Sequence, residues 1–178
     1  MAEKYVLLLR GINVTPSTRI AMSDLRELVN QAGYSGVRTL LQSGNVILES
    51  SVAPDVPALD RAITSRTGVN SRALVLDAAR FRRIVAAFPL SEVALDESKA
   101  LITFVDRMPD ADAVARLSDA ELAPEQLVLG AEAVYQWIPG GVLATKLPPK
   151  FARQFGENAT ARNLRTAKKI VALLDATP

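Results

Sequence analysis

Three short polar segments of the sequence carry the side chains best suited to holding a ligand. They span residues 10–13, 42–45 and 160–163, and they combine glycine, arginine and small polar or amide side chains. Arginine can bind a phosphate or a carboxylate through two parallel N–H groups, and amide side chains can hydrogen-bond a base or a ribose. The candidate ligand-binding residues are Arg10, Gly11, Asn13, Gln42, Ser43, Asn45, Thr160, Arg162 and Asn163.

The first two segments also have a structural interpretation. Arg10 could form a surface ion pair, and Asn13 and Asn45 are typical of turns because asparagine tolerates left-handed backbone. Ser43 is followed by Gly44, a combination that is common in the turn of a hairpin. For these residues the sequence leaves both ligand binding and turn formation open.

The third segment is expected where the last helix begins, near Ala161. A helix N-terminus together with Arg162 would favour an anion. In the alternative interpretation, Thr160 or Asn163 caps the helix and Arg162 pairs with Glu157. The sequence does not decide between these two roles.

Charge is distributed unevenly along the chain. Between Lys146 and Lys169 there are seven basic residues and a single acidic one, which gives +6, whereas the rest has 14 basic and 18 acidic residues, which gives −4. A basic segment on an acidic body suggests an anionic partner such as a nucleotide, a phosphorylated metabolite or RNA. The alternative is a solvated helix face without a partner.

Two residue types that often perform catalysis are missing, because the sequence contains no cysteine and no histidine. Their absence excludes disulfides, thiol nucleophiles, thiolate metal sites and Ser–His–Asp catalysis within one chain. It also removes the most common metal ligand. Glycine-rich phosphate loops with lysine and calcium-binding loops are missing as well. We therefore expect no metal and no cofactor, and we assign no catalytic residue.

The first half of the chain predicts a ferredoxin-like unit that would bring two of the polar segments together. Strand-like runs at 5–9, 37–41, 46–48 and 72–76 alternate with helical patterns in the order β-α-β-β-α-β. In this topology the first two strands are parallel, and the third lies antiparallel between them. The loop after the first strand and the hairpin between the next two then share one edge of the sheet. We expect residues 10–13 and 42–45 to meet there.

The second half predicts a similar order. Its elements are a connecting helix with an apolar face, a strand at 100–105, a helix opening at Pro109 and carrying Val114 and Leu117, strands at 126–129 and 133–138, a short helix around 149–155, and a last helix in the place of a fourth strand. We expect an α+β protein with two ferredoxin-like subdomains, antiparallel sheets and a C-terminal helix. The predicted divisions are 1–77, a connecting helix and linker at 78–97, and 98–178.

The polar segments also carry a family resemblance. Tyr5–Val14 (YVLLLRGINV), Gln42–Val46 (QSGNV) and Ala159–Asn163 (ATARN) resemble the signature segments of the bacterial family named "domain of unknown function family number 1697". Thr15-Pro16 and Leu164 depart from its usual pattern of glycines and tryptophan. The resemblance implies two ferredoxin-like subdomains and no particular activity.

The composition is that of an ordinary globular protein, with 49% hydrophobic and 22% charged residues. No apolar run reaches the roughly 20 residues of a membrane helix, and the N-terminus lacks a signal-peptide pattern. We expect a cytoplasmic protein without membrane contact that binds an anionic small molecule or nucleic acid. The alternatives are an enzyme without histidine or cysteine that acts on a phosphorylated substrate, and a structural protein that forms homo-oligomers through its sheets.

Overall fold

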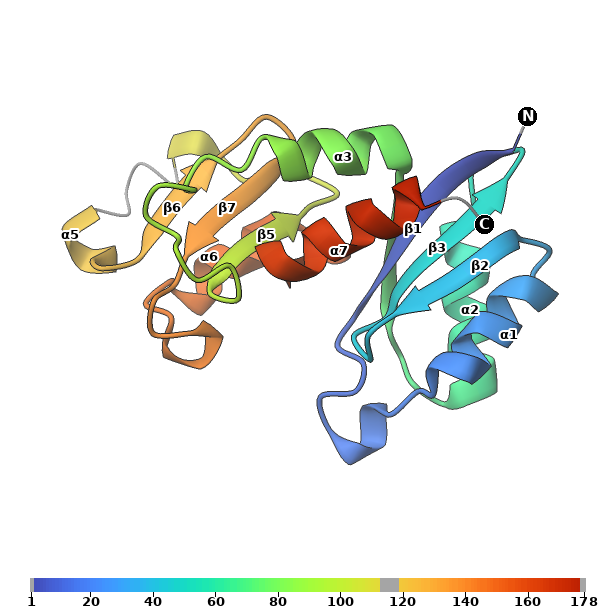
Figure 1. Ribbon diagram of the computed structural model, residues 1–178. Helices are drawn as coiled ribbons and strands as arrows, with labels where there is room; N and C mark the ends of the chain where they lie inside the picture. The colour runs from blue at the N-terminus through green and yellow to red at the C-terminus, as the bar shows by residue number, and fades with distance from the viewer. Residues whose placement is uncertain (1, 113–118, 177–178) are drawn as a thin grey trace. The chain divides into compact units, whose positions relative to one another are not determined.

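The computed structural model describes residues 2–112 and 119–176 of the 178-residue chain. The chain divides into two compact units, one made of residues 1–82 and 170–178 and the other of residues 83–169. Each unit contains one four-stranded antiparallel sheet (Figure 1). The domain limits at residues 77 and 97 stay predictions.

The first unit has the expected β-α-β-β-α-β order. Its strands lie in the order β2-β3-β1-β4, so the third strand lies between the first two and is antiparallel to both. The ferredoxin-like prediction is therefore confirmed for this unit. The elements are β1 (Glu3–Arg10), η1 (Pro16–Thr18), α1 (Met22–Gln31), β2 (Ser35–Leu40), β3 (Asn45–Ser50), α2 (Val56–Thr67) and β4 (Arg72–Asp77).

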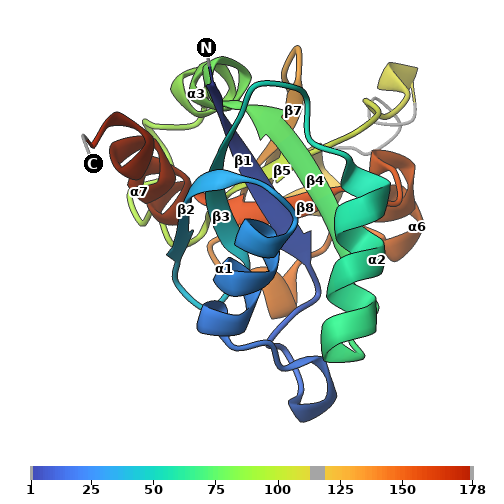
Figure 2. The same ribbon diagram turned by 90° about the vertical axis from the view of Figure 1, so that its right-hand side faces the viewer.

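The core of this unit lies between the sheet and its two helices. Leu7 and Leu9 of β1 alternate with residues of the opposite face, and they belong to one buried cluster with Leu25 of α1 and Ile63 of α2. Figure 2 shows α1 and α2 over the same face of the sheet. Fully burying such side chains stabilises the fold by roughly 1.5–3 kcal/mol each. This packing holds the strand ends, and with them the polar loops, in fixed places.

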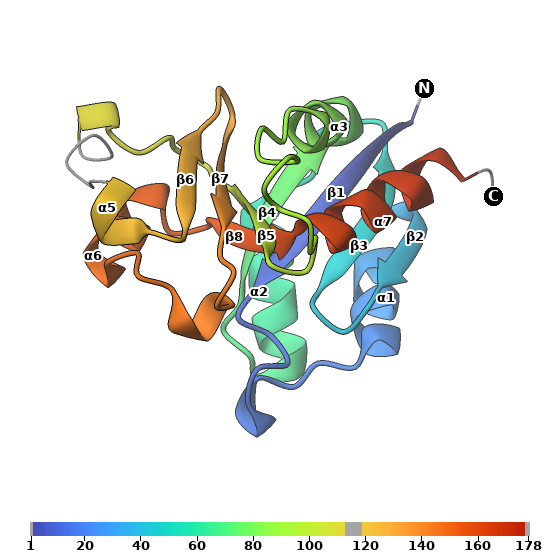
Figure 3. The same ribbon diagram turned by 60° about the vertical axis from the view of Figure 1, so that its left-hand side comes forward.

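The second unit repeats the order of the first. Its strands lie in the order β6-β7-β5-β8 (Figure 3). When the strands are numbered within each unit, both sheets have the order 2-3-1-4. The elements are β5 (Ala100–Phe104), α5 (Asp119–Leu122), β6 (Gln126–Leu129), β7 (Ala133–Trp137), η2 (Val142–Ala144), α6 (Pro149–Ala152), η3 (Arg153–Phe155) and β8 (Thr160–Asn163). The chain passes from one unit to the other within α3 (Ala78–Ala86) and again within α7 (Leu164–Asp175).

The expected beginning of the last helix near Ala161 is wrong. Residues 160–163 form β8, which pairs antiparallel with β5, and α7 begins only at Leu164. Apolar residues follow helical spacing only from Leu164 onward. In the preceding residues, Thr160 and Arg162 are buried and Ala161 is exposed, which is the alternation typical of a strand. The second unit thus has a fourth strand, and the terminal helix α7 follows it directly.

One further expectation falls largely outside the described part of the chain. Val114 and Leu117, which were expected on a helix opening at Pro109, are not among the described residues.

Across residues 2–112 and 119–176, no helix combines the length and the apolar character that crossing a membrane requires.

Candidate functional site

One edge of the first sheet gathers three polar chain segments, and we call this edge the rim. It consists of the end of β1 with residues 10–13, the β2–β3 hairpin with residues 41–45, and the beginning of β4 with residues 70–72. The backbone N–H of Leu9 donates to the carbonyl of Gly44 at 2.9 Å. The side chain of Asn13 donates to the carbonyl of Gln42 at 2.6 Å. The expected meeting of the first two segments is confirmed.

The amide of Asn13 is engaged by the backbone around it. Its Nδ2 donates to the carbonyls of Gln42 and Ile20, and its Oδ1 accepts from the N–H of Ile20 at 2.8 Å. Its backbone is left-handed, with φ 55°, a conformation that asparagine tolerates better than most residues. Asn13 therefore closes the loop after β1 and fastens it to the hairpin.

Asn45 and Gly44 build the hairpin from inside. The Asn45 side chain is 1% exposed, and its Nδ2 donates to the carbonyl of Leu40 and to Oγ of Ser43, both at 2.9 Å. Gly44 has φ +70°, and a Cβ there would lie 2.7 Å from the Cβ of Leu9. Asn45 thus holds the hairpin through its side chain, whereas the left-handed backbone of the hairpin lies at Leu41 and Gly44.

The exposed candidates of the rim are Arg10, Gly11, Gln42 and Ser43. The structure adds Arg72, which sequence reasoning missed. Arg10 and Arg72 lie directly opposite each other in the antiparallel pair β1–β4, so their side chains share one face of the sheet with Cβ atoms about 5 Å apart.

The neighbouring hydroxyl of Ser71 donates to the carbonyl of Arg10 at 2.9 Å and ties the two strand ends together. A topological signal for Arg72 was present in the sequence. The fourth strand of a β-α-β-β-α-β unit runs antiparallel to the first, so its first residue lies opposite the last residue of strand one.

One carboxylate, that of Asp60, lies near the rim and reduces its positive electrostatic potential. Asp60 of α2 accepts the N–H of Ala73 at 2.9 Å. Burial raises the pKa of Asp60, while the Ala73 N–H and the charge of Arg72 act in the opposite direction. Part of the positive field of Arg72 therefore acts on Asp60, and the rim combines two guanidinium groups with one nearby carboxylate.

The third predicted segment belongs to the second unit. Arg162 is buried in β8, where its Nη1 donates to Oγ1 of Thr160 and to the carbonyl of Ala161, both at 2.8 Å. Burial lowers the pKa of Arg162 to about 10, so it stays protonated at neutral pH. Asn163 accepts the N–H of Thr166 at 2.8 Å, which is the N-cap interaction of α7.

The basic segment that begins at Lys146 is partly neutralised within its own unit. Arg165 forms an ion pair with Asp96 at 3.3 Å, and Lys168 forms one with Glu97. These contacts agree with the interpretation of this stretch as a solvated helix face. In the part of the chain that the structure describes, no group of three or more Asp or Glu residues could hold a metal ion.

Comparisons with known proteins agree with this fold. The family model described as "Protein of unknown function (DUF1697)" matches residues 2–135. No curated protein matches the sequence. The structure is similar to that of the conserved bacterial protein SP0830 from Streptococcus pneumoniae, with a TM-score of 0.76 and 22% identity over 99% of this chain and 100% of that chain. At this identity the similarity shows a shared α+β fold alone.

Proposed function

We propose, for a chain that belongs to the family of proteins of unknown function DUF1697, that the rim of the first unit binds an anionic ligand through Arg10 and Arg72. The observation that carries the proposal is the direct opposition of these two arginines at the end of β1 and the beginning of β4. The ligand chemistry is a phosphate group, as in a nucleotide, a phosphorylated metabolite or RNA. We expect the protein to act in the cytoplasm.

The charge arrangement supports this proposal. Two like charges directly opposite each other on a sheet destabilise it. An anion that contacts both guanidinium groups removes this repulsion. A phosphate has enough oxygens to accept two N–H groups from each arginine. Arg10 and Arg72 are both exposed, so a ligand can reach them from solvent.

The hairpin beside the arginines can add neutral contacts. Gln42 and Ser43 are exposed at its tip, while Asn13 and Asn45 hold the backbone of the two loops in place. In this division of roles the buried or engaged asparagines position the rim, and the exposed side chains contact the ligand. A rim that is fixed before binding loses little conformational entropy when the ligand arrives.

The test is a titration with chemically simple probes. Inorganic pyrophosphate, AMP and a short single-stranded RNA are each titrated into the full-length protein by isothermal calorimetry. We expect at least one of them to bind, and Arg72→Gln, which removes the charge and keeps a polar side chain, to weaken that binding. Losing a hydrogen bond to a charged group costs about 1.5–3 kcal/mol, which corresponds to roughly 10- to 150-fold in affinity.

The matched control is Arg26→Gln, because Arg26 is also an exposed arginine but lies on α1. It should leave the affinity unchanged apart from a small effect of net charge. Absence of binding by all three probes would contradict the proposal. So would an equal loss of affinity in the Arg26 and Arg72 variants, since that would indicate attraction by overall charge without a defined site.

A further inference from the structure

Two further arginines lie at the same end of the first unit as the rim. Arg19 directly precedes Ile20, whose backbone N–H donates to Oδ1 of Asn13 at 2.8 Å. Arg66 lies in the last turn of α2, and β1 and α2 both end at the lower side of the view in Figure 2. Both arginines are exposed, and neither forms an ion pair with another residue in the described part of the chain. Their guanidinium groups are therefore available to an anion from solvent.

The chain segments that meet at this end are rich in arginine and poor in acidic residues. They are residues 10–24, 41–45 and 66–72, and we call them together the rim end. The rim end contains one acidic residue, Asp24, and four arginines: Arg10, Arg19, Arg66 and Arg72. Its charge is therefore +3. With the nearby Asp60 of α2 included, the charge is still +2.

The opposite end of the same unit carries the reverse charge. It consists of residues 2–4, 32–35, 49–56 and 76–78, around the starts of β1, β2 and α2 and the ends of α1, β3 and β4. These residues include Lys4 and four acidic residues: Glu3, Glu49, Asp55 and Asp77. Their charge is −3. A separation of charge along one unit directs a polyanion to the positive end and increases the rate at which it associates there.

The four arginines are held at separate places of the rim end. Arg10 and Arg72 form a direct pair in the sheet. Arg66 belongs to the layer of helices that covers this sheet, and Arg19 belongs to the short loop between η1 and α1. One phosphate group can contact the pair in the sheet, but the arginines of the helix and the loop lie in other segments. A ligand that contacts all four therefore presents several phosphates in succession, as the backbone of a nucleic acid does.

The connection from α2 to β4 fixes Arg66 relative to the pair in the sheet. Gly68 ends the helix with a left-handed backbone, and its N–H donates to the carbonyl of Thr64 at 2.9 Å. The hydroxyl of Ser71, at the end of this short connection, donates to the carbonyl of Arg10 at 2.9 Å. An arrangement that is fixed in this way loses little conformational entropy when a ligand binds.

Neutral polar side chains accompany the arginines. Gln42 lies in the hairpin and Asn70 in the connection to β4, and both are exposed. A side-chain amide carries two donors and an acceptor, so it can hydrogen-bond the edge of an unpaired base. A single strand presents its bases in this way, whereas a duplex keeps their pairing edges occupied. The side chains of the rim end therefore fit a single strand better than a duplex.

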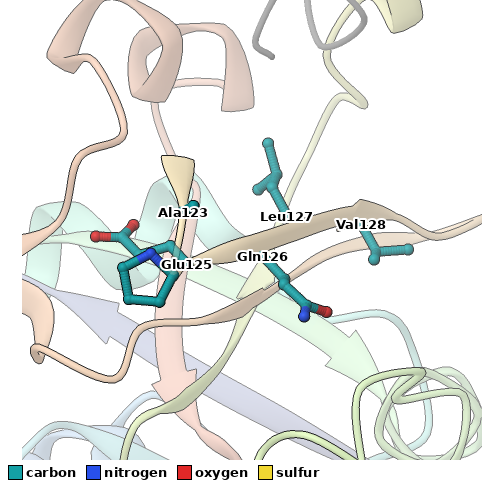
Figure 4. Close-up of a pocket in the computed structure, with 6 residues that line it drawn as sticks. Ala123, Glu125, Gln126, Leu127 and Val128 are labelled. Carbon is teal, nitrogen blue, oxygen red and sulfur yellow. The ribbon is translucent and has the colours of Figure 1, made fainter. Parts of the chain in front are cut away.

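The cavity of the second unit does not offer a polyanion a comparable site. Its volume is about 570 Å³, and its described lining residues are Ala123–Val128 (Figure 4). The charged side chain among these lining residues is Glu125, whose carboxylate accepts from Oγ1 of Thr145 at 2.8 Å and from the N–H of Lys146 at 2.7 Å. A carboxylate repels phosphate, so the charge of this lining favours the rim end as the place for a polyanion.

We propose that the rim end of the first unit binds the phosphodiester backbone of a single-stranded nucleic acid. Arg10 and Arg72 hold one phosphate, and Arg19 and Arg66 contact phosphates that neighbour it along the strand. This inference rests on the proposed function, because it extends the anion site of the rim. It adds the class of ligand and two contact residues. Contacts to phosphate carry no sequence information, so the arginines accept strands of different sequence.

The experiment measures the affinity of the full-length protein for a fluorescent twelve-residue oligouridylate by anisotropy, at salt concentrations between about 50 and 200 mM. For single strands, the logarithm of the association constant falls with the logarithm of the salt concentration by about 0.7 per contacted phosphate. Four contacts predict a slope of about −2.8, which is a loss of roughly 50-fold in affinity across this range. We expect Arg19→Gln and Arg66→Gln each to weaken binding and to reduce the slope by about 0.7.

The matched control is Arg61→Gln. Arg61 is also an exposed arginine of α2, but it lies more than one turn before Arg66 and on a different side of the helix. This variant should leave the slope unchanged. An equal loss of affinity in the Arg61 and Arg66 variants would overturn the inference, and so would tighter binding of a duplex RNA of the same length.

Pyrophosphate separates this inference from the proposed function. It is small enough to contact the arginine pair of the sheet alone, so its affinity should not change in the Arg19 and Arg66 variants. If pyrophosphate binds and these two variants leave the oligouridylate slope unchanged, the inference is wrong while the proposed function stands. If neither pyrophosphate nor oligouridylate binds, both are wrong.

Discussion

Gly44 has a left-handed backbone, and the place where its Cβ would lie is already occupied. With φ +70°, a Cβ at this position would come within 2.7 Å of Leu9 Cβ and of Ile12 Cδ1. Gly68 has nearly the same φ of +71°, but nothing lies within 4 Å of its added Cβ. Comparing substitutions at these two glycines therefore separates the cost of backbone strain from the cost of steric overlap.

We predict that Gly44→Ala lowers the free energy of unfolding by about 2–4 kcal/mol, because overpacking adds to the backbone cost. Gly68→Ala should cost only about 1 kcal/mol, since it carries the backbone cost alone. Urea denaturation followed by circular dichroism measures both. An equal loss of stability in the two variants would show that Leu9 and Ile12 move away from the added Cβ at position 44 without cost.

Asp60 offers a second test at the scale of one residue. Burial raises the pKa of its carboxyl in the folded protein, so the folded state holds a proton at a pH where the unfolded chain has released it. Ionisation of Asp60 then costs stability as the pH rises through this raised pKa. Asp60→Asn keeps an oxygen that can accept the Ala73 N–H and removes the ionisation.

We therefore predict that wild type gains stability relative to Asp60→Asn as the pH is lowered from 7 towards 4. Urea denaturation of both proteins across this range measures the difference. As a control, Asp55→Asn changes an exposed carboxylate that caps α2. A difference between wild type and Asp60→Asn that does not change with pH, or that changes in the opposite direction, would contradict the assigned effect of burial.

At the scale of elements, the boundary between β8 and α7 depends on one cap. Asn163 is the last residue of the strand, and its Oδ1 accepts the N–H of Thr166 in the first turn of the helix. Removing such a cap costs about 1 kcal/mol, whereas aspartate can replace asparagine in this role. We predict that Asn163→Ala destabilises the protein by about 1 kcal/mol and that Asn163→Asp does not.

Thermal and urea denaturation of the two Asn163 variants measure this effect. If alanine and aspartate are tolerated equally well, the hydrogen bond to Thr166 does not stabilise the boundary.

The same boundary shows why sequence reasoning misplaced the beginning of the helix. The alternation of Thr160, Ala161 and Arg162 is too short to indicate a strand, and only pairing with β5 makes it one.

At the scale of the whole molecule, the β-α-β-β-α-β order of the first unit, and that of the second unit up to its last strand, could be predicted because apolar runs and helical spacings mark most elements locally. The same topology predicted that residues 10–13 meet the hairpin at 42–45. It could not show that Asn13 is held by the backbone of Ile20, because this contact depends on the path of an irregular loop.

The division of the chain into units leads to the last prediction. Residues 170–178 belong to the first unit, although they are far from its other residues in sequence. The Nζ of Lys4 in β1 donates to the carbonyl of Leu174 at 3.0 Å, and Arg82 forms an ion pair with Asp175 at 2.7 Å. Leu174 itself is 1% exposed. A protein that ends at residue 169 lacks all of these contacts.

We predict that this truncation destabilises the first sheet more than the second. Hydrogen exchange should show faster exchange of the amides in β1, β3 and β4, with a smaller change in β5 and β7. A control that replaces Asp175 by Asn tests the exposed ion pair alone, which should contribute no more than about 1 kcal/mol. If residues 1–77 instead form a folded protein with a dispersed NMR spectrum and native exchange rates, the division at residue 77 is correct and the last helix is dispensable for the first sheet.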